Sequence, residues 1–246
     1  MIKIVEEKQE NVSGYTLLEG FPGLGLVGTI AVKYLIEKLK FEPYAHIESD
    51  FFLPIVRVHN GLPIHPSTIY INKQRKLLAL MSEQIIPRSG VLPLAKAVVE
   101  WAKKKGIKRI ISIEGIGTHS EDKREMIYGI ACSEEAKREL LKNGIKPVSE
   151  GITSGVTSMI LLELSKQNKI IAYSLLGNVK VAEDYKAAAS CLDKLSQMLE
   201  LNIDTKPLLK EAKKFEAALL KQLKQLKEAH ENVRKFEESA HPLMYT

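Results

Sequence analysis

The chain has 246 residues, of which 45% are apolar and 27% are charged, and its formal net charge is +6. This composition is typical of a folded protein with one sizeable core, and it excludes a disordered chain. The 36 basic residues are interspersed with 30 acidic ones, so we expect no nucleic-acid-binding stripe. No apolar run approaches the roughly 20 residues of a membrane span and no signal peptide is apparent, so we expect a cytoplasmic protein.

Short β-rich runs alternate with amphipathic stretches over residues 1–202, which predicts a layered α/β domain. Two β-rich runs between Thr68 and Ser82 flank a short polar segment, which predicts an antiparallel hairpin and therefore a mixed sheet. The predicted strands are Tyr15 to Glu19, Tyr44 to Glu48, Thr68 to Asn72, Leu77 to Ser82, Arg109 to Glu114 and Ile170 to Leu176.

Helical periodicity and capping residues mark five helices in the same region. Ser133 is a candidate N-cap, followed by two glutamates in the first turn, and Gly106 and Gly144 follow helix ends. The predicted helices are Val27 to Leu39, Val91 to Lys105, Ser133 to Lys142, Val156 to Gln167 and Asp184 to Glu200.

The composition changes after Asn202, where the chain becomes rich in Lys, Glu, Leu, Ala and Gln and contains no further glycine. Two heptad positions are apolar there, apart from Gln222, so we predict a helical stalk or coiled coil over residues 203–239. We expect part of its seam to pair with another subunit or with the preceding helix. The seam residues are Ala212, Leu219, Leu226 and Val233, with Leu208, Phe215, Gln222, Ala229 and Phe236.

A GxGxxG pattern, Gly23-Leu24-Gly25-Leu26-Val27-Gly28, lies between a predicted strand and a predicted helix. This context is typical of dinucleotide binding, with Glu48 or Asp50 as the acidic residue that contacts the ribose. The alternative, which we favour, is that the glycines serve the tight turn and close packing between helix and sheet.

Polar residues after the strand that ends at Glu114 form a candidate acid–base cluster, because ligands of open α/β sheets bind beyond the carboxyl ends of strands. We favour a solvent-exposed loop and predict no catalytic residue. The cluster comprises Glu114, Thr118, His119, Glu121 and Asp122. A second Gly/Ser-rich turn, 151–158, misses the GxSxG nucleophile pattern, so we interpret Ser154 as a helix N-cap.

The cysteines and histidines form no metal-binding pattern. Cys132 and Cys191 lie far apart without a CxxC motif, and we expect two reduced thiols in the core. The histidines show neither HxH nor HExxH spacing, so the sequence predicts no metal site and no cofactor. They are His46, His59, His65, His119, His230 and His241.

The chain ends in a distinctive segment, in which Pro242 stops the stalk and leaves residues 240–246 as an extended tail. Its last three residues, Met244, Tyr245 and Thr246, resemble the hydrophobic-tyrosine-any tail of proteasome activators and assembly factors. Such a tail offers an apolar side chain, an aromatic hydroxyl and a terminal carboxylate to a partner.

The segment Gly20 to Gly28 resembles the opening signature of the proteasome assembly chaperone 2 family, specifically its archaeal members. Ile111 to Gly117, Gly151 to Leu162 and Ile170 to Leu176 are also similar to stretches of that family, so the resemblance covers residues 10 to 200. It implies a three-layer α/β/α domain with a mixed sheet, akin to nucleoside-phosphorylase-like folds. It also implies homo-oligomers and binding to the α-ring of the 20S proteasome.

On this resemblance, Met244 corresponds to the hydrophobic position, Tyr245 to the tyrosine and Thr246 to the terminal residue, while the glycines Gly23, Gly25 and Gly28 have a structural role. We therefore expect tail-mediated binding to 20S α subunits that assists assembly, or ATP-independent association with the core particle. The alternative is a nucleotide- or small-ligand-binding enzyme, ATP-grasp or nucleoside-phosphorylase-like, that uses the Gly23 to Gly28 loop.

Overall fold

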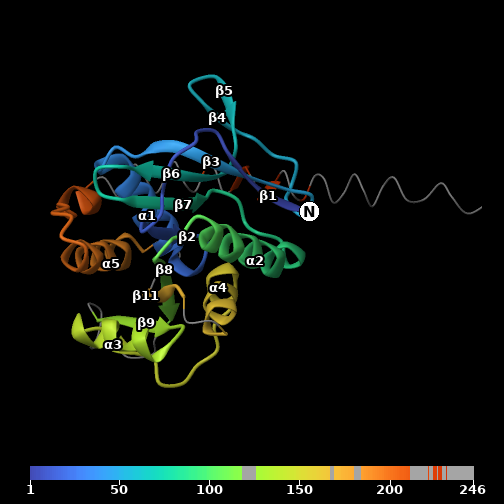
Figure 1. The fold of residues 1–246 in the computed structure, drawn as a ribbon. Helices are drawn as coiled ribbons and strands as arrows, with labels where there is room; N and C mark the ends of the chain where they lie inside the picture. Colours follow the sequence, from blue (N-terminus) through green and yellow to red (C-terminus); the bar gives the residue numbers. More distant parts are fainter. Residues whose placement is uncertain are drawn as a thin grey trace, which may run out of the picture.

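The computed structural model describes residues 1–117, 126–166, 169–179 and 184–210, together with 221, 224, 225, 227, 228 and 231. A nine-stranded mixed sheet with the order β1-β3-β6-β7-β2-β8-β11-β9-β10 forms its centre (Figure 1). The strands are β1 (Ile2–Glu6), β2 (Thr16–Gly20), β3 (Glu42–Ser49), β6 (Ser67–Asn72), β7 (Leu77–Ser82), β8 (Arg109–Gly117), β9 (Ile127–Ala131), β10 (Lys146–Pro147) and β11 (Ile171–Val179). A separate hairpin consists of β4 (Arg57–His59) and β5 (Leu62–Ile64).

The centre of the sheet is parallel. Strand β2 pairs in parallel with β7 and β8, and β8 pairs in parallel with β11. All five residues of β2 and all six of β7 are buried, as expected for strands that are covered on both faces. The carboxyl ends of β2, β8 and β11 therefore meet at one edge of the sheet.

Helices cover both faces of the sheet (Figure 1). They are α1 (Val27–Lys38), α2 (Arg88–Lys104), α3 (Glu134–Lys142), α4 (Val156–Ser165) and α5 (Tyr185–Met198), with a short 3₁₀ turn, η1 (Leu24–Leu26), before α1. Consecutive residues of β2 show which helices share a face, because side chains alternate along a strand. Gly20 lies against α1, whereas Glu19 accepts a hydrogen bond from Thr157 in α4. Helices α1 and α5 pack together on one side, and α2 and α4 pack together on the other.

The structure confirms the six predicted strands, the five predicted helices and the hairpin between β6 and β7, with boundaries that differ by no more than about one helical turn. The sequence analysis missed β1, β9, β10 and the β4–β5 hairpin. The mixed α/β character and the mixed sheet are likewise confirmed.

Most local predictions within the described residues are also confirmed. Cys132 and Cys191 are buried free thiols. The Ser133 hydroxyl caps α3 by accepting a hydrogen bond from the Ala136 N–H at 3.2 Å. The Ser154 cap is wrong, because the N-cap of α4 is Gly155, which has a φ of 101°, a value that favours glycine, and no side chain to cap the helix.

The chain beyond α5 packs back onto the domain. Leu201 and Leu208 are buried, and the Tyr34 hydroxyl donates a hydrogen bond to the carbonyl oxygen of Asp204 at 2.8 Å. The predicted stalk (203–239) lies largely outside the described residues and the predicted tail (240–246) lies wholly outside them, so both stay predictions. Within the described parts of the chain, no helix has the length and apolarity required to cross a bilayer.

Candidate functional site

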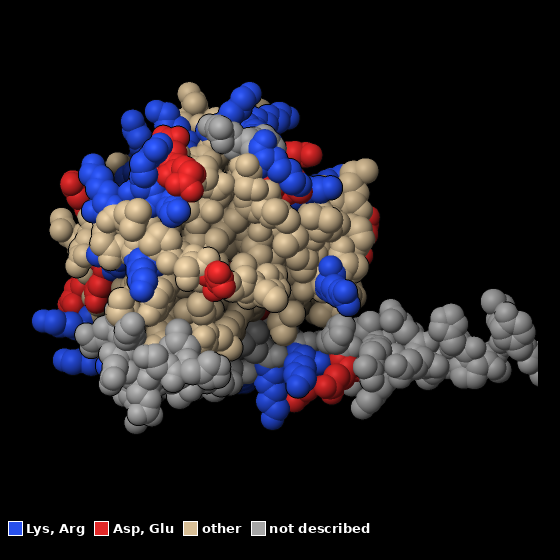
Figure 2. Space-filling view, turned by 90° about the horizontal axis from the view of Figure 1, so that it is seen from below, with Lys and Arg blue, Asp and Glu red and all other residues tan. Residues whose placement is uncertain are grey.

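A cavity of about 720 Å³ lies at the carboxyl ends of β2 and β8. Its walls are Pro22–Leu24 after β2, Glu114–Gly117 at the end of β8 and residues 148–155 before α4. The segment 148–155 runs along the lower side of the molecule in Figure 1. Figure 2 shows this side from below: its centre is largely free of charged side chains, and lysines and arginines lie around its margin. The cavity thus lies at the carboxyl ends of the parallel strands, where open α/β sheets bind ligands.

The glycine turn forms one wall and packs directly on the sheet. A Cβ atom at Gly28 would lie 2.1 Å from the carbonyl oxygen of Ile113 in β8. A Cβ atom at Gly115 would lie equally close, 2.1 Å, to the carbonyl oxygen of Leu24. Glycine is therefore required on both sides of this contact, since any side chain would force the turn and β8 apart.

The same turn needs an unusual backbone conformation. Gly25 has φ 64°, and a Cβ atom there would lie 2.6 Å from the side chain of Val179 in β11. Leu26 is also left-handed, with φ 50°, immediately before α1 begins. The glycines thus serve the turn and the close packing, as the structural interpretation predicts.

The dinucleotide interpretation is wrong, because the acidic residues that it assigns to the ribose lie far from the glycine turn in the sheet. In that motif the strand after the helix lies beside the first strand, whereas β7 and β6 separate β3 from β2 here. The Glu48 carboxylate instead contacts His46, and Asp50 pairs with the amino group of Met1. Neither acid belongs to the cavity wall.

Two carboxyl groups, one wholly buried and one partly buried, lie at the cavity. Glu19 of β2 is wholly buried, and its Oε1 accepts hydrogen bonds from the hydroxyls of Ser112 in β8 and Thr157 in α4. The other oxygen, Oε2, has no hydrogen-bond partner among the described residues. Glu114 follows Ser112 by two residues on β8, so it shares that face of the sheet, and it lines the cavity.

Burial controls the protonation of this carboxyl pair. Burial and, to a smaller extent, the charge of Glu114 together raise the pKa of Glu19 to about 8, although the hydrogen bonds from the Ser112 and Thr157 hydroxyls act to lower it. Burial also raises the pKa of Glu114 to about 7. The pair therefore holds at least one proton near neutral pH and offers both a donor and an acceptor. Sequence analysis found Glu114 but missed Glu19, whose signal is one acidic residue inside an otherwise apolar strand.

The PAC2 family model matches residues 17–223, which is most of the chain. The chain belongs to the PAC2 family. This confirms the resemblance to proteasome assembly chaperone 2 that the glycine signature indicates.

Several known proteins resemble this chain in sequence or in structure. An uncharacterized protein of Methanocaldococcus jannaschii is 31% identical over 93% of this PAC2 chain and 92% of its own length. Human proteasome assembly chaperone 2 is 24% identical over 49% of this chain and 48% of its own. The crystal structure of Pyrococcus furiosus PbaA, described as an archaeal homolog of proteasome-assembly chaperone, superposes with a TM-score of 0.83 and is 30% identical, covering 94% of this chain and 100% of PbaA.

Pyrococcus furiosus PbaB, described as an archaeal proteasome activator, shares the fold with a TM-score of 0.73 at 23% identity, covering 89% of the PAC2 chain and 98% of PbaB. Human proteasome assembly chaperone 2 and PbaA are thus described in terms of proteasome assembly, and PbaB in terms of proteasome activation.

Several predicted site residues lie outside the described part of this PAC2 chain. They are Thr118, His119, Glu121 and Asp122 of the acid–base cluster and Met244, Tyr245 and Thr246 of the tail. Of the residues that are described, Glu114 and Ser154 both line the cavity.

The contact between the glycine turn and β8 predicts a large difference between two neighbouring substitutions. Gly28→Ala should lower the free energy of unfolding by more than about 3 kcal/mol, because the new Cβ overlaps the Ile113 carbonyl oxygen. Gly23→Ala is the matched control, since its nearest neighbour would be the Phe21 carbonyl oxygen at 3.9 Å, and should cost less than about 1 kcal/mol. Urea denaturation measures both, and equal losses would contradict the packing role.

The buried carboxyl predicts a pH dependence of stability. The folded-state pKa of Glu19 is about 8, above its ordinary value of 4.5, so the folded chain holds a proton that the unfolded chain releases between these pH values. The free energy of unfolding should therefore fall as pH rises, by up to about 1.4 kcal/mol per pH unit. In Glu19→Gln this slope should flatten. Raising the pH from 5 to 9 should therefore lower the free energy of unfolding less in the variant than in the wild type. Parallel curves in urea denaturation across that range would refute the assignment.

Proposed function

We propose that this PAC2 protein is a proteasome assembly chaperone homologue that binds α subunits of the 20S proteasome through its C-terminal residues. The similarity to PbaA carries the proposal, because it extends over 94% of this chain and all of PbaA at 30% identity. PbaA is described as an archaeal homolog of proteasome-assembly chaperone. The similarity to human proteasome assembly chaperone 2 supports the same role.

The sequence of the tail supplies the binding chemistry. Met244 offers an apolar side chain, Tyr245 an aromatic ring with a hydroxyl, and Thr246 a terminal carboxylate. A cleft between adjacent α subunits that holds an apolar pocket and a cation would engage all three groups. One short tail binds weakly, but several tails on one scaffold raise the avidity by about 10² to 10⁴ when they dock together.

Exposed apolar side chains support the homo-oligomer that such avidity requires. The β4–β5 hairpin projects from the sheet in Figure 1, and its residues Val58 and Leu62 are 66% and 67% exposed. Arg57 ties the hairpin to the domain, with its Nε 2.9 Å from the Glu83 carboxylate. A fixed apolar projection of this kind suits contact with a second copy of the chain.

The packing around the glycine turn supports an association that needs no ATP. The side chain of Val179 lies over Gly25, and the Leu26 N–H already donates to the carbonyl oxygen of Gly23 at 3.0 Å. A phosphate-binding turn instead presents open N–H groups to its ligand.

Removal of Met244–Thr246 should abolish co-purification with 20S α-rings, because all three binding groups are lost together. Tyr245→Ala should weaken binding, and one extra glycine after Thr246 should do so as well by displacing the carboxylate. Pull-down of α-rings with each variant measures the effect.

The control for this experiment is the assembly state of the variants. Sedimentation should show that the truncated chain forms the same oligomer as the full chain, so that a loss of binding reports on the tail alone. Undiminished capture of α-rings by the truncated chain would refute the tail mechanism, and a monomeric full chain at micromolar concentration would refute the multivalent scaffold.

The carboxyl pair of Glu19 and Glu114 favours one other function, a binding site for a nucleoside or similar small ligand in the cavity. A nucleobase presents adjacent donors and acceptors that Glu114 is placed to pair with. If this function operates, adenosine or ATP should raise the melting temperature of the wild-type chain but not of Glu114→Gln. No shift in either protein would leave the chaperone role as the function of the domain.

A further inference from the structure

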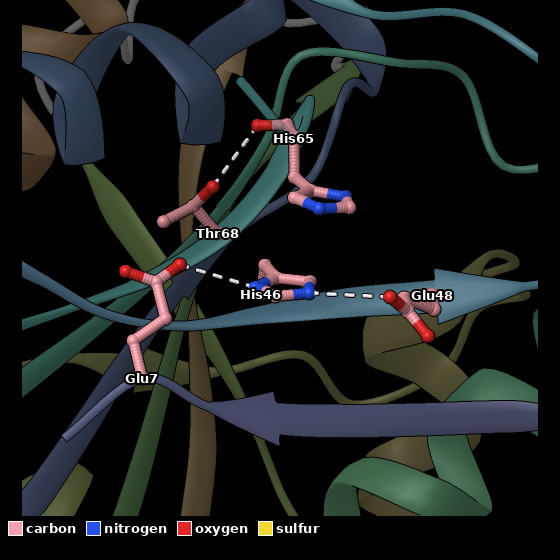
Figure 3. Close-up of polar contacts among 5 residues, drawn as sticks. All are labelled: Glu7, His46, Glu48, His65 and Thr68. Carbon is pink, nitrogen blue, oxygen red and sulfur yellow. Dashed lines mark hydrogen bonds and ion pairs between the residues drawn. The ribbon is translucent and has the colours of Figure 1, made fainter. Parts of the chain in front are cut away.

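Four side chains that carry metal-ligating groups meet on the sheet, away from the cavity (Figure 3). They are Glu7, which follows β1, His46 and Glu48 in β3, and His65, which precedes β6. One ligating atom each of His46, Glu48 and His65 lies within 4.8 Å of the other two. Among the described residues this is the one group of its kind.

Strand pairing explains why these residues converge. His46 lies opposite Val5 of β1, and Glu48 lies opposite Lys3. These four side chains, two from each strand, therefore lie on one face of the sheet. Ile47 points to the other face and is buried. The cluster therefore lies on the face opposite Ile47, where His46 is partly buried and Glu48 is exposed.

The residues directly before β6 place His65 over His46. The two imidazole rings stack with centroids 3.7 Å apart and planes inclined by 8°. The Thr68 hydroxyl donates a hydrogen bond to the carbonyl oxygen of His65 at 3.0 Å, which fixes the backbone there (Figure 3).

Glutamates flank both nitrogens of the His46 ring. Its Nδ1 lies 3.1 Å from Glu7 Oε1, and its Nε2 lies 3.4 Å from Glu48 Oε1. When Nδ1 donates its proton to Glu7, Nε2 directs a lone pair at the Glu48 carboxylate. Two acceptors then face each other, and a cation between them removes the repulsion. A carboxylate that orients a histidine from behind is the usual arrangement in metal sites.

We propose that His46 Nε2, a Glu48 carboxylate oxygen and a His65 ring nitrogen bind a divalent transition-metal ion, with Glu7 orienting His46. Two imidazoles and one carboxylate suit Zn²⁺, Co²⁺ or Ni²⁺ rather than Mg²⁺ or Ca²⁺, which prefer oxygen ligands alone. Water completes the coordination. Lys3 lies opposite Glu48 in the register of β1 and β3.

Binding requires a local rearrangement of side chains. Ligands of a tetrahedral zinc ion lie about 3.4 Å apart, given metal–ligand bonds of about 2.0–2.1 Å, so the donor atoms must approach one another. The His65 ring must also turn out of its parallel stack to direct its lone pair at the ion. Both His65 and Glu48 are exposed, so these rotations meet little resistance.

The ion would close the base of the segment that contains the β4–β5 hairpin. Glu48 lies at the end of β3 and His65 directly before β6, so one ion joins the two ends of residues 49–64. Metal binding would thereby restrict how the hairpin, with its exposed Val58 and Leu62, is held against the sheet.

Competition with a chromophoric chelator, using the full chain without an affinity tag, tests the site with Zn²⁺. The wild-type chain should bind one Zn²⁺ ion, and this binding should depend on the residues of the cluster. His46→Ala and His65→Ala should each weaken its binding at least about tenfold, and Glu7→Gln should weaken it by about 10- to 100-fold through the orientation of His46. His59→Ala, in the same hairpin but outside the cluster, is the matched control and should leave the affinity unchanged.

A second measurement separates the site from a folding defect. Limited proteolysis within residues 49–64 should slow when Zn²⁺ is added to the wild-type chain and should be unaffected by Zn²⁺ in His65→Ala, with circular dichroism showing that both are folded. The proposal is overturned if the wild-type chain binds no Zn²⁺, or if His46→Ala and His65→Ala bind it as tightly as the wild type.

Discussion

The structure depends on a direct backbone contact between the glycine turn and the neighbouring strand β8. Gly28 meets the carbonyl of Ile113, and Gly115 meets the carbonyl of Leu24, so neither segment tolerates a Cβ atom at the point of contact. This close contact places α1 on the central parallel strands, and the carboxyl ends of β2, β8 and β11 lie at a common edge. The cavity wall that the glycine turn forms with the end of β8 takes its position from this contact.

The two faces of β2 separate packing from chemistry. Gly20 lies against α1 on one face, while Glu19 on the other is held by hydroxyls from β8 and α4. The motif that resembles a nucleotide fingerprint is therefore a packing device. A domain built in this way suits a scaffold that presents binding groups elsewhere, which agrees with the named functions of its relatives.

Sequence reasoning succeeded where the signal is local. Apolar alternation marked β6 and β7, the Ser133 cap marked α3, and the glycine pattern correctly indicated a tight turn before α1. It failed where partners are distant in the chain. The histidine cluster joins β3 to the segment before β6 in space, although no metal-binding spacing links His46 to His65 in the sequence. Strand β9 was missed because Gly129 weakens its pattern, yet that glycine is needed where Leu140 of α3 packs against it.

Amide hydrogen exchange tests most directly whether the contact between the glycine turn and β8 organises the fold. The amides of α1 (Val27–Lys38) and β8 (Arg109–Gly117) should exchange only through global unfolding. Those of β9 (Ile127–Ala131), and the Lys146 amide of the short edge strand β10, should exchange faster. Exchange of α1 and β8 before β9 and β10 would contradict the account.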